Sequence, residues 1–148
     1  MPHENDIGFQ LHNLSNLLKR YFERSFASLH MDDNVSRNNL WILGYLAHNS
    51  HKDIFQKDIE NTFCVRRSTV SKVLRLMEEK GFIRRIDVDY DARLKKIVLT
   101  DSGKAVHDMM LHERNVAEQI LRQSVTSEEL EIFFNVMEKF KSNINHTL

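Results

Sequence analysis

The sequence contains a single cysteine, Cys64, among its 148 residues. One cysteine excludes an internal disulfide and fits a reducing compartment. No apolar run approaches the roughly 18 residues that a membrane span needs. The first ten residues, MPHENDIGFQ, lack the basic start and the apolar centre of a signal peptide. We therefore expect a cytoplasmic protein that makes no use of a membrane.

Proline and glycine are also scarce. Proline occurs only at position 2, and glycine only at positions 8, 44, 81 and 103. Because these two residues are the main helix breakers, long helices are permitted almost everywhere. The sequence also lacks a Gly-rich phosphate loop, a nucleophile motif and a His-Glu-x-x-His pair. It therefore predicts neither an enzyme nor a bound cofactor.

The chain has no net charge, but its charges are unevenly distributed. It contains 21 basic and 21 acidic residues. Between Arg66 and Lys96, ten basic residues accompany five acidic ones, so this segment has a charge of +5 and the rest of the chain −5. Such segregation indicates that one part of the molecule contacts a polyanion. A solvated basic face without a partner is the alternative.

Hydrophobic periodicity predicts a mainly α (α+β) fold with the element order ααααββαα. Apolar residues at helical spacing indicate helices at 7–29, from a cap at Ser36 to about 47, at 55–63 and at 66–80, the last ended by Gly81. FIRRIDV (82–88) and KKIVLT (95–100) alternate as strands, with DYDAR as the hairpin tip. Thr100 and the box TSEE (126–129) open two long helices, to about 124 and 145.

The segment QKDIENTFCVRRSTVSKVLR, residues 56–75, has the spacing of a helix-turn-helix. Five apolar residues fall at the places that fill the core between two crossing helices: Ile59, Phe63, Val65, Val70 and Val73. Two places depart from the common pattern. Glu60 stands where a small residue is usual, and Cys64 stands where the turn often has glycine. We expect a slightly opened turn.

The second helix of this motif has an apolar and a polar face. Val70, Val73, Leu74 and Met77 follow i, i+3, i+4 and i+7 spacing, so we expect them to be buried. The opposite face combines cations, which bind phosphates and guanine, with short hydroxyls that let the backbone approach the bases. The DNA-contacting residues predicted in the motif are Gln56, Arg66, Arg67, Ser68, Thr69, Ser71, Lys72 and Arg75.

Both terminal helices carry a wide apolar stripe. In the last helix it consists of Leu130, Phe133, Phe134, Met137, Phe140 and Ile144. Helices of about 20 residues are roughly 30 Å long, more than a small central unit can cover. We therefore expect both helices to pack against a second copy of the chain. Packing within one chain, as a bundle, is the alternative.

Residues 66–106 carry the most specific motifs of the chain. The small-residue-rich helix is followed by Gly81, by Asp91-Ala92-Arg93 and by Leu99-Thr100-Asp101-Ser102-Gly103. In these motifs, and over essentially its whole length, the sequence resembles the MarR family of bacterial winged-helix regulators. The resemblance implies a homodimeric repressor that occludes promoter DNA at a pseudo-palindromic operator. Residues 1–34 and 101–148 would form dimerisation helices, and residues 35–100 the winged helix-turn-helix domain.

The resemblance also assigns roles to the hairpin. Arg93 at its tip would enter a narrow minor groove, where the negative potential is enhanced. Asp91 would orient Arg93 by a salt bridge. The residues that would flank the DNA backbone are Arg84, Arg85, Lys95 and Lys96.

A signal that releases the DNA is expected as well. Many members of the family bind a small aromatic or phenolic effector between the dimer helices and the winged unit. The candidates here, which plain core packing would also explain, are His12, Phe26, Trp41 and Tyr45. A winged helix that contacts protein instead of DNA is the main alternative of another class. The basic recognition face argues against it, because a protein-binding surface more often presents aromatic anchors.

Two further kinds of signal remain open. Cys64 precedes a helix start beside Arg66 and Arg67, an environment typical of reactive thiols. Peroxide-sensing members, however, carry their cysteine in the first helix, and a free cysteine is most often a small hydrophobe. Asp108 and His112, at i and i+4, are candidate metal ligands, as are His30, Asp32 and Asp33 after the first helix. No cysteine completes a metal site in these regions.

Overall fold

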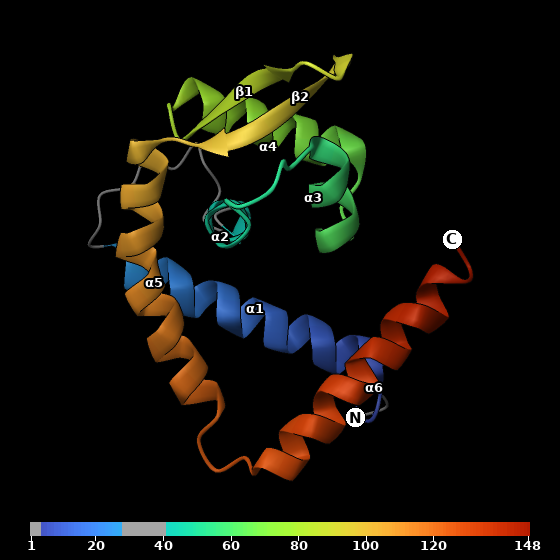
Figure 1. Ribbon diagram of the computed structural model, residues 1–148. Helices are drawn as coiled ribbons and strands as arrows, with labels where there is room; N and C mark the ends of the chain where they lie inside the picture. Colours follow the sequence, from blue (N-terminus) through green and yellow to red (C-terminus); the bar gives the residue numbers. More distant parts are fainter. Residues whose placement is uncertain (1–3, 28–40) are drawn as a thin grey trace. The chain divides into compact units, whose positions relative to one another are not determined.

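The computed structural model describes residues 4–27 and 41–148. Within these ranges the elements are α1 (Ile7–Phe26), α2 (Trp41–His48), α3 (Gln56–Phe63), α4 (Arg67–Glu79), β1 (Ile83–Val88), β2 (Asp91–Leu99), α5 (Asp101–Leu121) and α6 (Ser127–Asn145) (Figure 1). The predicted order ααααββαα and the winged-helix fold are confirmed. The predicted cap at Ser36 and the candidate ligands His30, Asp32 and Asp33 lie outside the described residues.

The chain divides into two compact units, Met1–Glu113 and Arg114–Leu148. The first contains α1 to α4, both strands and the start of α5, and the second contains the end of α5 and α6. The division into terminal dimerisation helices and a central winged domain stays a prediction. None of the helices in residues 4–27 and 41–148 combines the length and the apolar content needed to cross a bilayer.

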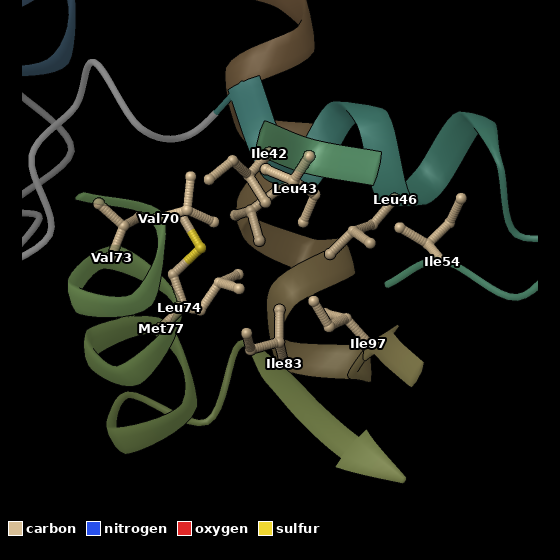
Figure 2. Close-up of a cluster of buried hydrophobic side chains, with 11 residues drawn as sticks. Ile42, Leu43, Leu46, Ile54, Val70, Val73, Leu74, Met77, Ile83 and Ile97 are labelled. Atoms are coloured by element: carbon tan, nitrogen blue, oxygen red, sulfur yellow. The ribbon is translucent and has the colours of Figure 1, made fainter. Parts of the chain in front are cut away.

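The core of the first unit lies between α2, α4 and the two strands. Leu43, Leu74 and Met77 are completely buried. Figure 2 shows the side chains of α2 and α4 pointing toward one another, with Ile83 of β1 and Ile97 of β2 closing the cluster. All four residues predicted for the buried face of α4 belong to this core. Burial of one face therefore fixes which side of α4 faces outward.

Helix ends follow the predicted signals. Gly81 adopts φ 75°, its N–H donates to the Glu78 carbonyl (2.9 Å), and the next N–H, of Phe82, donates to the Met77 carbonyl (2.9 Å). This pattern is a Schellman motif, which ends α4. At α6, Thr126 and Glu129 form the predicted capping box, each side chain accepting the backbone N–H of the other. The fifth helix ends at Leu121, three residues earlier than predicted.

The hairpin tip differs from the prediction. The turn consists only of residues 89–90, and β2 begins at Asp91 rather than Lys95. Val88 pairs with Asp91, but the adjacent Asp87 pairs with Lys95, so residues 92–94 form a bulge in β2. Because a bulge inserts residues without a partner, the alternation of polar and apolar residues breaks there. The strand therefore could not be recognised by its period.

Candidate nucleic-acid interface

The polar face of α4 points away from the core. Ser68, Thr69, Lys72 and Arg75 are exposed on it. Arg75 Nε lies 3.9 Å from a carboxylate oxygen of Glu79, a loose pair between two exposed side chains. In the described part of the chain, Lys72 has no carboxylate partner. A polyanion can thus pair with these cations without first breaking strong ion pairs within the chain.

The start of α4 is unusually basic. Arg66 is the N-cap residue and Arg67 the first residue of the helix; both are exposed and neither is paired with an acid within the described ranges. The first turn contains no acidic residue. The N-terminus of a helix has a partial positive charge, so cations here cost stability, roughly 0.3–1 kcal/mol each. An anion such as phosphate would be favoured by the arginines and by the free N–H groups together.

Gln56 connects the two helices of the motif. Its Nε2 donates to Ser71 Oγ on α4 (2.7 Å) and to Glu60 Oε1 on α3 (3.1 Å). All three side chains are half-buried. Gln56 and Ser71, predicted as DNA contacts, therefore also fix how α3 and α4 cross. Glu60, the unexpected residue at the fifth place, accepts one of the two hydrogen bonds from Gln56. The spacing of the motif did not predict these bonds.

The turn between the two helices contains Cys64. Its backbone has φ 53° and ψ 42°, the left-handed conformation that glycine adopts most easily. The N–H groups of Cys64 and Val65 both donate to the Glu60 carbonyl, so the turn is closed rather than opened as expected. The thiol is exposed, with Sγ 3.8 Å from the Asn61 carbonyl oxygen. A residue with a Cβ is therefore held in a glycine conformation.

This conformation predicts a stabilising substitution. We expect Cys64→Gly to raise the free energy of unfolding by about 0.5–1 kcal/mol. A Cβ costs about 1–2 kcal/mol in the left-handed region, and the greater freedom of glycine in the unfolded chain returns roughly 0.5–1 kcal/mol. Urea denaturation followed by circular dichroism measures the difference. Cys64→Ala is the control, because it removes the thiol and keeps the Cβ; an equal gain from alanine would contradict the backbone explanation.

The wing tip holds an ion pair between Asp91, the first residue of β2, and Arg93 in the bulge. Asp91 Oδ1 accepts the backbone N–H of Arg93 (2.9 Å) and its Nε (3.1 Å), and Oδ2 accepts Nη2 (3.0 Å). These side-chain bonds, and then the backbone bond, lower the pKa of the Asp91 carboxyl. The Arg93 side chain is nevertheless 90% exposed. Its guanidinium is thus oriented by the chain but open to a ligand, as the predicted role of Asp91 requires.

The other cations of the hairpin are partly engaged. Arg84 is exposed, whereas Arg85 Nε lies 3.4 Å from a Glu78 carboxylate oxygen, tying β1 to the end of α4. Lys95 Nζ lies 3.7 Å from Asp87 Oδ1 across the hairpin. Lys96 Nζ lies 3.0 Å from Asp53 Oδ1, in the segment before α3. Arg84 is thus the least engaged of the four.

The four candidate effector residues are not gathered in one place. Phe26 is buried and stacks on Phe22, whose ring also meets Trp41 edge-on at 6.3 Å. Tyr45 packs instead against Phe63 of α3, at 5.7 Å between ring centroids. His12 is exposed on α1, where it bonds Asn16, and precedes Phe26 by 14 residues. At a rise of 1.5 Å per residue, that is about 21 Å along the helix.

One of the two candidate metal ligands on α5 already has another partner. Asp108 accepts Lys104 Nζ at 2.8 Å, and this bond lowers the pKa of its carboxyl. His112 is exposed one turn further along α5. Within residues 4–27 and 41–148, no three histidine, cysteine, aspartate or glutamate side chains come together in a way that could hold a metal ion.

Comparison with known proteins gives one consistent result. A family model described as "MarR family" matches residues 33–94. The Bacillus subtilis (strain 168) protein YybA, an uncharacterised helix-turn-helix-type transcriptional regulator, is 25% identical over 91 residues, 62% of this chain and 61% of YybA. This chain thus aligns with about three-fifths of that relative. YdgJ of the same organism, described in the same words, is 24% identical over 97% of this chain and 82% of YdgJ.

A solved structure agrees with these sequence matches. The crystal structure of an S. aureus MepR–DNA complex superposes with a TM-score of 0.82 and 25% identity, covering 95% of this chain and 99% of MepR. Both relatives are described as transcriptional regulators, so the sequence matches are to regulators and not to enzymes. In its winged helix-turn-helix and in the match of residues 33–94 to the family model, the chain is similar to the MarR family of transcriptional regulators.

Proposed function

We propose that this regulator acts as a homodimeric repressor that binds a pseudo-palindromic DNA operator and is released by a signal. The observation that carries the proposal is the outward face of α4. There the apolar residues are buried while Arg67, Lys72 and Arg75 are exposed. The width of the major groove admits one helix, so this face would contact base edges and phosphates together. MepR, which has the same fold, was crystallised with DNA.

The wing would supply the second contact. Arg93 is exposed at the tip and oriented by Asp91. A guanidinium is attracted to a narrow, A·T-rich minor groove, where the negative potential is strongest. The flanking phosphates would be contacted mainly by Arg84 and Lys95, because the Nζ of Lys96 is bonded to Asp53.

The apolar surface of α6 supports the proposed homodimer. No residue of this helix is buried, and Phe133, Phe134 and Ile144 of its apolar stripe are each exposed by 46–61%. Apolar surface of this extent marks a protein interface. Two copies would present two recognition helices. Half-sites one helical turn apart require a fixed distance between these two helices. A signal that changes this distance by a few ångströms would end simultaneous docking and release the promoter.

DNA binding by fluorescence anisotropy tests the proposal. We expect tight binding to a palindromic fragment from upstream of the protein's own gene, with a steep salt dependence. Arg93→Ala should weaken binding about tenfold, because it removes a minor-groove contact. Lys72→Ala should weaken it about fivefold and reduce the salt slope by about 1, as expected for one lost phosphate contact.

Lys139→Ala is the matched control, because it removes an exposed lysine of α6 far along the sequence from α4 and the wing. It should leave both affinity and salt slope unchanged. Weak binding that is insensitive to salt and to the first two substitutions would overturn the DNA-binding proposal in favour of a protein partner. Aromatic acids, peroxide and zinc can be added to the same assay to identify the releasing signal, with Cys64→Ala as the test of a redox response.

A further inference from the structure

A cluster of side chains joins the wing turn to the segment before α3. Tyr90, in the turn between β1 and β2, donates its hydroxyl to Asp53 Oδ2 (3.1 Å). The other oxygen of Asp53 accepts Lys96 Nζ from β2 (3.0 Å). The Tyr90 ring also meets the ring of Phe55 edge-on, at 6.5 Å between centroids. Asp53 therefore binds both Tyr90, 37 residues later in the sequence, and Lys96, 43 residues later.

The same segment holds the base of the wing. The Ile97 N–H donates to the Ile54 carbonyl at 2.7 Å, so a backbone bond ties the segment to β2. Phe55 is the N-cap residue of α3, and its N–H donates to Asp58 Oδ2 in the first turn of that helix (2.8 Å). The next residue, Gln56, is bonded to Ser71 of α4. Contacts thus run without interruption from the wing turn through α3 to the recognition helix.

We propose that Tyr90 and Asp53 are positioning residues, which clamp the wing turn to the start of α3 and thereby aim Arg93 relative to α4. The inference rests on the proposed DNA contact of Arg93. A two-stranded hairpin alone is only marginally stable. Here its pairing is further interrupted by the bulge at residues 92–94, next to Tyr90. Without a clamp on the far side of the bulge, the tip could change its direction while the base of the wing stayed paired.

Electrostatics agree with this arrangement. The bond from Lys96 is the main cause that lowers the pKa of the Asp53 carboxyl, and the bond from Tyr90 adds to it. The pKa of the Tyr90 hydroxyl is raised, first by desolvation and then by the bond to Asp53. Both shifts favour the charged form of Asp53 and the protonated form of Tyr90, which are the acceptor and donor forms that the clamp needs.

The inference differs from a direct role of Tyr90 on DNA. Tyr90 is 66% exposed at the wing tip, so its hydroxyl also has access to a phosphate. A direct contact would contribute to affinity whether or not Arg93 is present. A positioning residue acts through Arg93 and loses its effect when Arg93 is removed. A double-mutant cycle separates the two cases.

The experiment measures DNA affinity by anisotropy for the wild type, Tyr90→Phe, Arg93→Ala and the double variant. Tyr90→Phe keeps the ring against Phe55 and removes only the hydroxyl. We expect it to weaken binding about fivefold in the wild-type background and less than twofold in the Arg93→Ala background. Asp53→Ala should give the same pattern. Ser50→Ala, which removes an exposed hydroxyl three residues before Asp53, is the control and should change nothing.

Each outcome has one meaning. Equal losses in both backgrounds would overturn the inference and assign Tyr90 a direct DNA contact. Normal affinity of Tyr90→Phe and Asp53→Ala, with Arg93→Ala still weakened, would overturn the clamp and leave the proposed function intact. Absence of DNA binding by the wild type would overturn the proposed function itself. Amide hydrogen exchange adds a readout without DNA. If the clamp holds the tip, the Arg93 N–H, which donates to Asp91 Oδ1, should exchange several times faster in Tyr90→Phe, while the Ile97 N–H at the base of the wing stays protected.

Discussion

Replacing Gly103 by alanine is expected to lower the free energy of unfolding by about 3 kcal/mol or more, the largest single-methyl effect anticipated in this chain. Gly103 lies in the first turn of α5. A Cβ built there would stand 2.0 Å from the Phe82 carbonyl oxygen and 2.9 Å from Leu99 Cδ1. Rotation of a side chain cannot move the alanine Cβ away from the Phe82 carbonyl oxygen at 2.0 Å or from the carbonyl carbon next to it, because both are backbone atoms. The backbone itself would have to move.

The backbone around Phe82 is held by several bonds at once. The Phe82 carbonyl accepts the Thr100 N–H (3.0 Å), and its N–H closes the Schellman motif of α4 on Met77 (2.9 Å). The Thr100 hydroxyl donates to the Gly81 carbonyl and accepts the Gly103 N–H (3.0 Å). A shift at Gly103 would therefore disturb the end of α4, the start of β1 and the cap of α5 together. The motif Leu-Thr-x-x-Gly acts here as a joint between the recognition helix, the wing and α5.

Gly8→Ala is the matched control for this prediction. Gly8 lies in the first turn of α1, and a Cβ there would meet only Asp6 Oδ1, at an ordinary contact distance of 3.4 Å. Alanine has the higher helix propensity, so we expect a gain of about 0.5 kcal/mol. Urea denaturation at one fixed protein concentration compares the variants, because the stability of an oligomer depends on concentration. If the free energy of unfolding of Gly103→Ala lies within about 1 kcal/mol of wild type, the backbone at this joint shifts more easily than these contacts imply.

Local signals were sufficient to predict most of the fold. Gly81, Thr126 and Glu129 mark helix ends by bonds that reach no further than five residues, and the structure contains each of them. The buried face of α4 was equally predictable, because its spacing of apolar residues depends on the helix alone. At these helix ends and on this helix face, the prediction and the structure agree.

The interface was predicted only in part. The exposed cations of α4 follow from the helical period, whereas the links of Gln56 to Ser71 and of Asp53 to Tyr90 and Lys96 join residues 15 to 43 positions apart. Such contacts are set by tertiary packing, and no periodicity announces them. The closed turn at Cys64 was also missed, since the sequence does not reveal that a cysteine occupies a glycine conformation. The bond between Lys96, a predicted DNA contact, and Asp53 was missed because it too is set by tertiary packing.

Replacing Phe134 by glutamate is expected to dissociate the proposed dimer at micromolar concentration and to weaken binding to a palindromic operator at least about 100-fold. Phe134 is 53% exposed on the apolar stripe of α6, and its ring meets that of Phe133 at 5.5 Å. A charge buried in an interface without a partner is strongly unfavourable. A monomer would contact one half-site only and would lose the gain of roughly 10²–10⁴ that linked binding provides.

Asn135→Glu is the matched control, because it introduces the same charge one residue further along α6, at an exposed polar position outside the stripe. Glutamate is a good helix former, so both variants should keep the helix. Analytical ultracentrifugation gives the oligomeric state, and anisotropy on full and half operators gives the affinity. A loss of dimer that reduces only the full-operator affinity would separate assembly from recognition: α6 would set how many recognition helices reach the DNA, and α4 with the wing would set what each one contacts. If Phe134→Glu stays dimeric with normal affinity, the stripe is not the dimer interface. Other helices must then set the distance between the two recognition helices.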